Sequence, residues 1–141
     1  SEINAAFLWA QLEHLEEIQA KRKHIWNRYH DRLKTLEECD CFRMPDIPDY
    51  ATNNAHMFYL VCRSLEERSG LIQVLKDNDI VAPFHYLSLH RSEYYKDKHD
   101  GRKLPFCDGY MDTLVRMPLY YELTDEQQDN IINVVKRYYE E

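Results

Sequence analysis

The residues best suited to binding a ligand gather in one short segment, His85-Tyr86-Leu87-Ser88-Leu89-His90. Imidazole and phenol groups both donate and accept hydrogen bonds, which suits them to phosphate groups and sugar hydroxyls. If this segment is extended, alternate side chains share a face, so Tyr86, Ser88 and His90 would lie together with His85 opposite. The alternative from the pattern alone is a pair of ordinary histidines that flank a strand. A zinc site is disfavoured, because no third or fourth ligand stands at a recognisable spacing.

Arg116 is the second candidate, because it stands among apolar residues in Arg116-Met117-Pro118-Leu119-Tyr120-Tyr121. It could face an anionic ligand, or it could pair with one of the many acids of the chain, and the pattern favours the pairing. A third polar feature, Asn53-Asn54-Ala55-His56, leads into an apolar segment. Its side chains are expected to bond to local backbone groups, which is a structural role.

Nothing in the sequence indicates a catalytic nucleophile. There is no G-x-S-x-G pattern and no glycine-rich phosphate loop. The lysines stand in solvent-like contexts, so none is distinguished as a Schiff-base lysine. The sequence therefore predicts no catalytic, cofactor-binding or metal-binding residue within residues 1–141.

Length and composition fit a single domain, residues 1–141, with 44% hydrophobic and 13% aromatic residues. The net charge of −7 disfavours general nucleic-acid binding, because an acidic surface repels phosphate backbones. No apolar run approaches the roughly 20 residues of a membrane span, and the chain opens unlike a signal peptide. Two of the four cysteines form C-x-C rather than C-x-x-C. We expect a cytoplasmic protein with reduced cysteines.

The elements that must position the candidate residues begin with a long N-terminal helix. Residues 3–37 contain no glycine or proline, and apolar side chains recur at helical spacings from Leu8 to Leu36. A straight helix of about 35 residues would be about 50 Å long, whereas a compact domain of this size has a radius of gyration of about 14 Å. We expect the helix to bend or break, or its start to lie beside something outside the chain. With no lead-in loop, the chain is expected to be a fragment cut at a linker.

Two capping boxes predict further helices, one opened by Ser64 and Glu67 and the last opened by Thr124 and Gln127. Other segments are assigned from apolar content and turn residues. Residues 55–62, 80–89 and 115–119 are expected to be extended, 91–107 to be a polar surface excursion, and Asp108 to start a short helix that ends at Leu114. The order predicts an α+β fold, in which helices pack on a small, mostly antiparallel sheet.

Five motifs along the chain resemble the DegT/StrS family of sugar-nucleotide aminotransferases. They occur in the family's order and span nearly the whole chain. They are Ser1 to Leu12, similar to its "seinAA…QL" helix; Asn54 to Tyr59, similar to "nAHmfy"; His85 to His90, similar to "HYxPLH"; Arg116 to Tyr120, similar to "RLPL(F/Y)"; and Thr124 to Gln127, similar to the start of the final helix. The resemblance is greatest to the transaminases that form dTDP-4-amino-4,6-dideoxygalactose.

The resemblance implies the C-terminal small domain of a fold-type I aminotransferase, an enzyme that uses pyridoxal phosphate to move an amino group from glutamate to a keto-sugar nucleotide. The Schiff-base lysine would lie upstream of Ser1, in a large domain outside this chain, so the isolated chain is expected to be inactive. His85 and Tyr86 would face the nucleotide sugar with His90 nearby, and Asn4 and Arg116 are further candidates. The family also implies a homodimer and a role in polysaccharide or lipopolysaccharide synthesis.

Ser88 departs from the family pattern, which has proline at this position. Proline would fix the backbone and remove an N–H group, so the placement of His90 is left open. The alternative function is a free-standing binding or interaction module without catalysis, whose exposed helix face recruits a partner.

Overall fold

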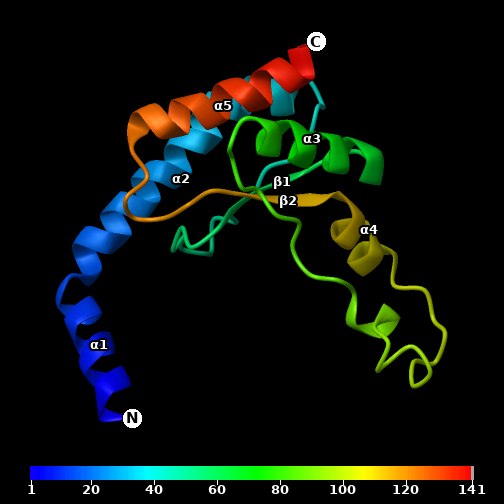
Figure 1. The fold of residues 1–141 in the computed structure, drawn as a ribbon, viewed down its shortest axis with the longest axis horizontal. Helices are drawn as coiled ribbons and strands as arrows, with labels where there is room; N and C mark the ends of the chain where they lie inside the picture. The colour runs from blue at the N-terminus through cyan, green and yellow to red at the C-terminus, as the bar shows by residue number, and fades with distance from the viewer. Residues whose placement is uncertain (141) are drawn as a thin grey trace.

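A computed structural model describes residues 1–140. The N-terminal helix breaks at His14 into α1 (Glu2–Glu13) and α2 (Leu15–Glu38). His14 leaves the helical conformation, with φ −109° and ψ 16°, and its N–H bonds to the carbonyl of Gln11, three residues back. Figure 1 shows α1 projecting away from the other elements, towards the N-terminus. The long helix predicted from the sequence is therefore two helices, and only α2 packs in the body of the domain.

The sheet consists of β1 (Phe58–Val61) and β2 (Leu114–Met117), which pair antiparallel along their whole length. Single bridges add Arg43 beside β1 and Phe84 beside β2. The α+β class with a small antiparallel sheet is thus confirmed. The pairing joins two segments that are far apart in the sequence, so it determines which residues before β1 and around β2 lie close together.

The remaining helices are α3 (Leu65–Asp77), the 3-10 turn Leu89–Arg91, α4 (Pro105–Thr113) and α5 (Asp125–Glu140). In Figure 1, α2, α3 and α5 lie on one side of the strand pair, and α4 ends directly before β2 begins. The later part of the connection from α3 to α4, which contains the 3-10 turn, extends away from this body. We call residues 85–104 the arm.

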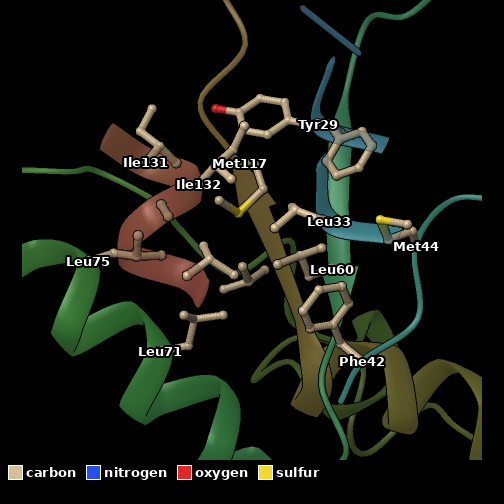
Figure 2. Close-up of a cluster of buried hydrophobic side chains, with 14 of the residues drawn as sticks. Tyr29, Leu33, Phe42, Met44, Leu60, Leu71, Leu75, Met117, Ile131 and Ile132 are labelled. Carbon is tan, nitrogen blue, oxygen red and sulfur yellow. The ribbon is translucent and has the colours of Figure 1, made fainter. Parts of the chain in front are cut away.

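The core lies between these helices and the sheet, as Figure 2 shows. Tyr29, Leu33, Leu60, Leu71 and Ile132 are completely buried, and they come from α2, β1, α3 and α5. Burying each such side chain contributes about 1.5–3 kcal/mol relative to leaving it exposed. The sheet is therefore covered on one face by three helices that all pack on the same strands.

The Thr124 capping box is complete, whereas at the Ser64 box only the hydroxyl cap forms, because the Glu67 carboxylate accepts from the N–H of Arg63 rather than of Ser64. The Ser64 hydroxyl accepts from the Glu67 N–H at 3.1 Å, which satisfies a free donor at the start of α3. The Thr124 hydroxyl accepts from the Gln127 N–H at 3.2 Å, and the Gln127 side chain accepts from the Thr124 N–H at 3.0 Å. These contacts fix where α3 and α5 begin, as the sequence predicted.

Two expectations were wrong. Residues 80–89 do not form a strand, because Pro83 has no N–H to donate and the segment touches β2 only through the Pro83 carbonyl and the Phe84 bridge. Tyr86, Ser88 and His90 consequently do not share a face. The short helix begins at Pro105 rather than at Asp108, since proline suits the first helical position.

No helix within residues 1–140 is both long enough and apolar enough to cross a membrane. The four cysteines are all free.

The Ser64 cap predicts a measurable loss of stability when its hydroxyl is removed. Ser64→Ala is expected to lower the free energy of unfolding by about 1 kcal/mol, measured by urea denaturation. Ser69→Ala in the same helix is the control: its hydroxyl bonds back to the Leu65 carbonyl at 2.7 Å and caps nothing. Equal effects of the two substitutions would contradict the capping role.

Candidate functional site

His85, Tyr86 and Arg116 line one open hollow of about 520 Å³, together with His56 and Pro118. The rings of His85 and Tyr86 lie 4.4 Å apart. The volume is in the range of sites that hold small molecules. Three of the five residues predicted from sequence are therefore brought together in one place.

The strand pair positions this hollow. Arg116 lies in β2 opposite Tyr59 of β1, and its backbone N–H bonds to the Pro83 carbonyl at 2.9 Å. That contact holds the segment that carries His85 beside the end of β2. His56 lies two residues before β1, at the same end. The side chains of His56, His85 and Arg116 therefore reach the hollow from neighbouring backbone segments.

His56 is a site residue that the sequence analysis treated as structural. Its neighbour Ala55 has a positive φ of 51°, and the Ala55 N–H donates to the Asn53 side chain at 2.8 Å. The His56 ring lies 3.1 Å from the Asn54 side-chain oxygen. The asparagines do bond locally, as expected, but the turn they stabilise aims the histidine at the hollow. The polar run was the signal that could have identified it.

Arg116 forms no ion pair within residues 1–140, so the pairing favoured by its sequence context is not seen there. Its Nε and the Nδ1 of His85 are both buried and without a hydrogen-bond partner in the described chain. Arg28 Nε and Gln128 Oε1 share this property, but those side chains bond through another atom, to Asp129 and to the Ile25 carbonyl.

A buried polar atom without a partner costs about 1–3 kcal/mol. His85 and Arg116 bear this cost on the wall of the same hollow. An anionic or strongly accepting ligand in the hollow would offset this cost at Arg116, and at His85 in the tautomer that carries a proton on Nδ1. Guanidinium presents its donors in a fixed fork that matches phosphate or carboxylate.

Tyr29, a buried residue of α2, holds Pro118 in the wall of the hollow. Its phenol donates to the Pro118 carbonyl at 2.9 Å. Burial raises the pKa of Tyr29 well above its usual range, with the Tyr120 phenol as a smaller cause, so the phenol stays protonated and keeps donating. Pro118 lines the hollow and is thereby fixed to α2.

His90 lies apart from this hollow. Its Nε2 is 3.2 Å from Asp108 Oδ1, and its ring is 5.0 Å from the ring of His99. Asp108 also lies 3.6 Å from Arg91 and accepts from the Ser88 hydroxyl at 3.4 Å. One carboxylate of α4 thus holds three residues at the base of the arm. Sequence reasoning identified Asp108 only as a helix start, and this second role comes from the tertiary arrangement.

Ser88 is 3% exposed, and its N–H donates to the sulfur of Met111 at 3.3 Å. The hydrogen bonds of its N–H and hydroxyl fix the chain here. Two residues further on, His90 lies beside Asp108 rather than in the hollow of His85.

Asn4 lies on α1, where no residue is buried. Its backbone N–H donates to the Ser1 hydroxyl at 3.5 Å, which caps the helix. Figure 1 shows α1 and the arm on different sides of the body, so the structure does not bring Asn4 to the hollow of His85. The apolar side chains of α1 are exposed, among them Phe7 at 71% and Trp9 at 67%.

No lysine lines the hollow of His85, and no group of three or more metal-ligating side chains occurs within the described residues 1–140. The hollow therefore offers donors for an anion or a hydroxyl-rich ligand. It supplies no amine for an imine with a carbonyl compound.

Comparison with known proteins identifies the family. Residues 1–136 match the DegT/DnrJ/EryC1/StrS aminotransferase family. The chain belongs to this family. The match covers nearly the whole chain, as the order of the five motifs predicted, and it includes the segments that carry His85 and Arg116.

Solved structures agree with this assignment. A DegT/DnrJ/EryC1/StrS aminotransferase from Brucella abortus is 25% identical, with a TM-score of 0.81 over 97% of this chain and 35% of its own. A putative sugar aminotransferase from Streptococcus pneumoniae, in its PLP-form, is 25% identical, with a TM-score of 0.78 over 94% of this chain and 34% of its own.

A third structure shares the fold at lower identity. DesV from S. venezuelae, in complex with a ketimine intermediate, is 23% identical, with a TM-score of 0.87 over 97% of this chain and 36% of its own. The chain thus spans about a third of the length of the structures that it matches.

The Asp108 contacts predict that the arm loosens when the carboxylate is neutralised. Asp108→Asn is expected to ease local opening by about 1 kcal/mol, which is about a fivefold rise in the rate of tryptic cleavage after Lys96, Lys98 or Arg102. Asp97→Asn, in the arm but outside any ion pair in the described chain, is the control and should leave the rate unchanged. A similar cleavage rate for Asp108→Asn and the unmodified chain would contradict the role of Asp108 in holding the arm.

Proposed function

We propose that this chain forms the substrate-site wall of a sugar-nucleotide aminotransferase. The enzyme would move an amino group from glutamate to a keto-deoxysugar nucleotide of the dTDP-4-keto-6-deoxyhexose type. The observation that carries the proposal is the pair of unpartnered buried nitrogens, His85 Nδ1 and Arg116 Nε, in side chains that line one hollow of a chain that belongs to an aminotransferase family. A nucleotide sugar carries phosphate groups beside hydroxyls, which suits this set of donors.

The side chains divide into two roles in this proposal. Arg116 and His85 bind and orient an anionic group of the nucleotide, since both side chains line the hollow and each has a buried nitrogen without a partner in the described chain. Tyr86, whose ring lies against that of His85, contacts the sugar hydroxyls. His90 and Asp108 do not contact the ligand in this proposal. They hold the segment that carries His85 and Tyr86. Asn4 belongs to α1 and would contribute only where another segment covers that helix.

Pyridoxal phosphate is the proposed cofactor, and it supplies the electron sink that amino transfer needs. No lysine lines the hollow, and in this proposal the cofactor's lysine belongs to a part of the enzyme outside residues 1–141. This chain would bind the substrate, orient it and exclude water. The proposed enzyme is a cytoplasmic homodimer, and its product would enter polysaccharide or lipopolysaccharide synthesis.

The exposed apolar residues of α1 favour a second candidate, a binding module that works without catalysis. Phe7, Leu8 and Trp9 are each at least 60% exposed. An apolar helix face of this kind normally packs against a partner. In the enzyme reading that partner is the rest of the aminotransferase, and in the module reading it is a separate protein. The two readings differ in whether the complete protein binds the cofactor.

The cofactor measurement decides between them. The complete protein with pyridoxal phosphate is expected to show the near-visible absorbance of an imine, which glutamate converts to the pyridoxamine form. A keto-sugar nucleotide should then restore the first spectrum. A protein that gives no imine band would favour the binding module. A protein that reacts with glutamate but not with a keto-sugar nucleotide would refute the proposed acceptor.

A further inference from the structure

A second hollow of about 450 Å³ opens between α4 and the Val61 end of β1. The hollow of His85 lies at the Met117 end of β2, and the two strands run antiparallel with Val61 opposite Leu114. The two hollows are therefore at opposite ends of the same strand pair. Small-molecule sites have volumes of about 300–1,000 Å³, so this space is sufficient for a ligand of its own.

Gly109 forms part of the wall of this second hollow without a structural reason to be glycine. It lies inside α4, where glycine weakens a helix relative to alanine. Its φ is not positive, and a Cβ atom placed on it would meet no atom within 4 Å. The residue therefore relieves neither strain nor crowding. What it does is leave open space at the surface of α4 that faces the hollow.

Two aromatic side chains of α4 line the same space and are uncovered. Phe106 is 84% exposed and Tyr110 is 48% exposed. Exposed rings at the edge of a concave surface are suited to stack on a planar aromatic group, which would bury apolar area on both sides. The glycine between them in the sequence gives such a ring room to approach the helix.

The charge of the hollow selects a small anion. Arg43 and Arg63 both line it, but Arg63 is bonded through Nε and Nη2 to Glu67 at 3.0–3.3 Å. Arg43 forms no ion pair with any described residue, so its guanidinium is free. Asp40 also lines the hollow and would limit the negative charge that a ligand can carry. One free guanidinium fits a single phosphate or carboxylate group.

We propose that the hollow between α4 and β1 binds a planar aromatic anion, of which a nucleoside monophosphate is the representative. The heterocycle stacks on Phe106 and Tyr110 above Gly109, and the phosphate bonds to Arg43. This site does not depend on the proposed aminotransferase function, because none of its residues lines the hollow of His85.

The three glycines of the chain make the test direct, since glycine amides are well separated in a nitrogen–proton correlation spectrum. The 141-residue chain is titrated with adenosine monophosphate, and in parallel with adenosine and with inorganic phosphate. The Gly109 signal, identified by its loss in Gly109→Ala, is expected to shift with adenosine monophosphate. Gly70 and Gly101 line neither hollow and serve as internal controls.

Two variants then separate the contacts. Arg43→Gln is expected to weaken the adenosine monophosphate affinity at least tenfold and to leave adenosine unaffected. Gly109→Leu fills the hollow and is expected to abolish binding of both, while Gly109→Ala retains it. Arg43 and Gly109 are surface positions, and a dispersed spectrum verifies that each variant is folded. No shift of Gly109 at millimolar nucleotide, or an affinity unchanged in both Arg43→Gln and Gly109→Leu, would overturn the proposal.

Discussion

The antiparallel pairing of β1 with β2 is the constraint on which the rest of the structure depends. It joins residues 58–61 to residues 114–117, and α2, α3 and α5 pack on the strands that result. The same pairing places His56 and Arg116 at one end of the sheet, and the bond from Arg116 to the Pro83 carbonyl adds His85. In another register, these contacts would not bring the three side chains to one hollow.

Buried polar atoms without a hydrogen-bond partner are the feature that distinguishes this end of the sheet. Four buried side-chain atoms of the described chain have no partner, and two of them belong to side chains that bond elsewhere. His85 and Arg116 have no such compensation and share one hollow. A folded chain bears a cost of about 1–3 kcal/mol for each such group, which a ligand with acceptor oxygens would recover. Stability and binding are therefore opposed at this site.

Local chemistry made much of this predictable. The Ser64 cap and the Thr124 capping box indicated the starts of α3 and α5, because a cap depends on neighbouring residues alone. The extended reading of residues 80–89 failed because Pro83 limits pairing with β2, which depends on a tertiary partner. For the same reason, alternation could not show that His90 turns to Asp108. His85, Tyr86 and Arg116 were found from residue type, whereas their meeting required the strand register.

A double-mutant cycle on nucleotide-sugar binding tests the central claim, that His85 and Arg116 bind the same ligand. The affinity of the complete protein is measured by calorimetry for His85→Phe, Arg116→Met and the double variant. If both donors bond one ligand, the two losses are expected to be non-additive, with a coupling of about 0.5–3 kcal/mol. Additive losses, or an unchanged affinity in either single variant, would contradict the account.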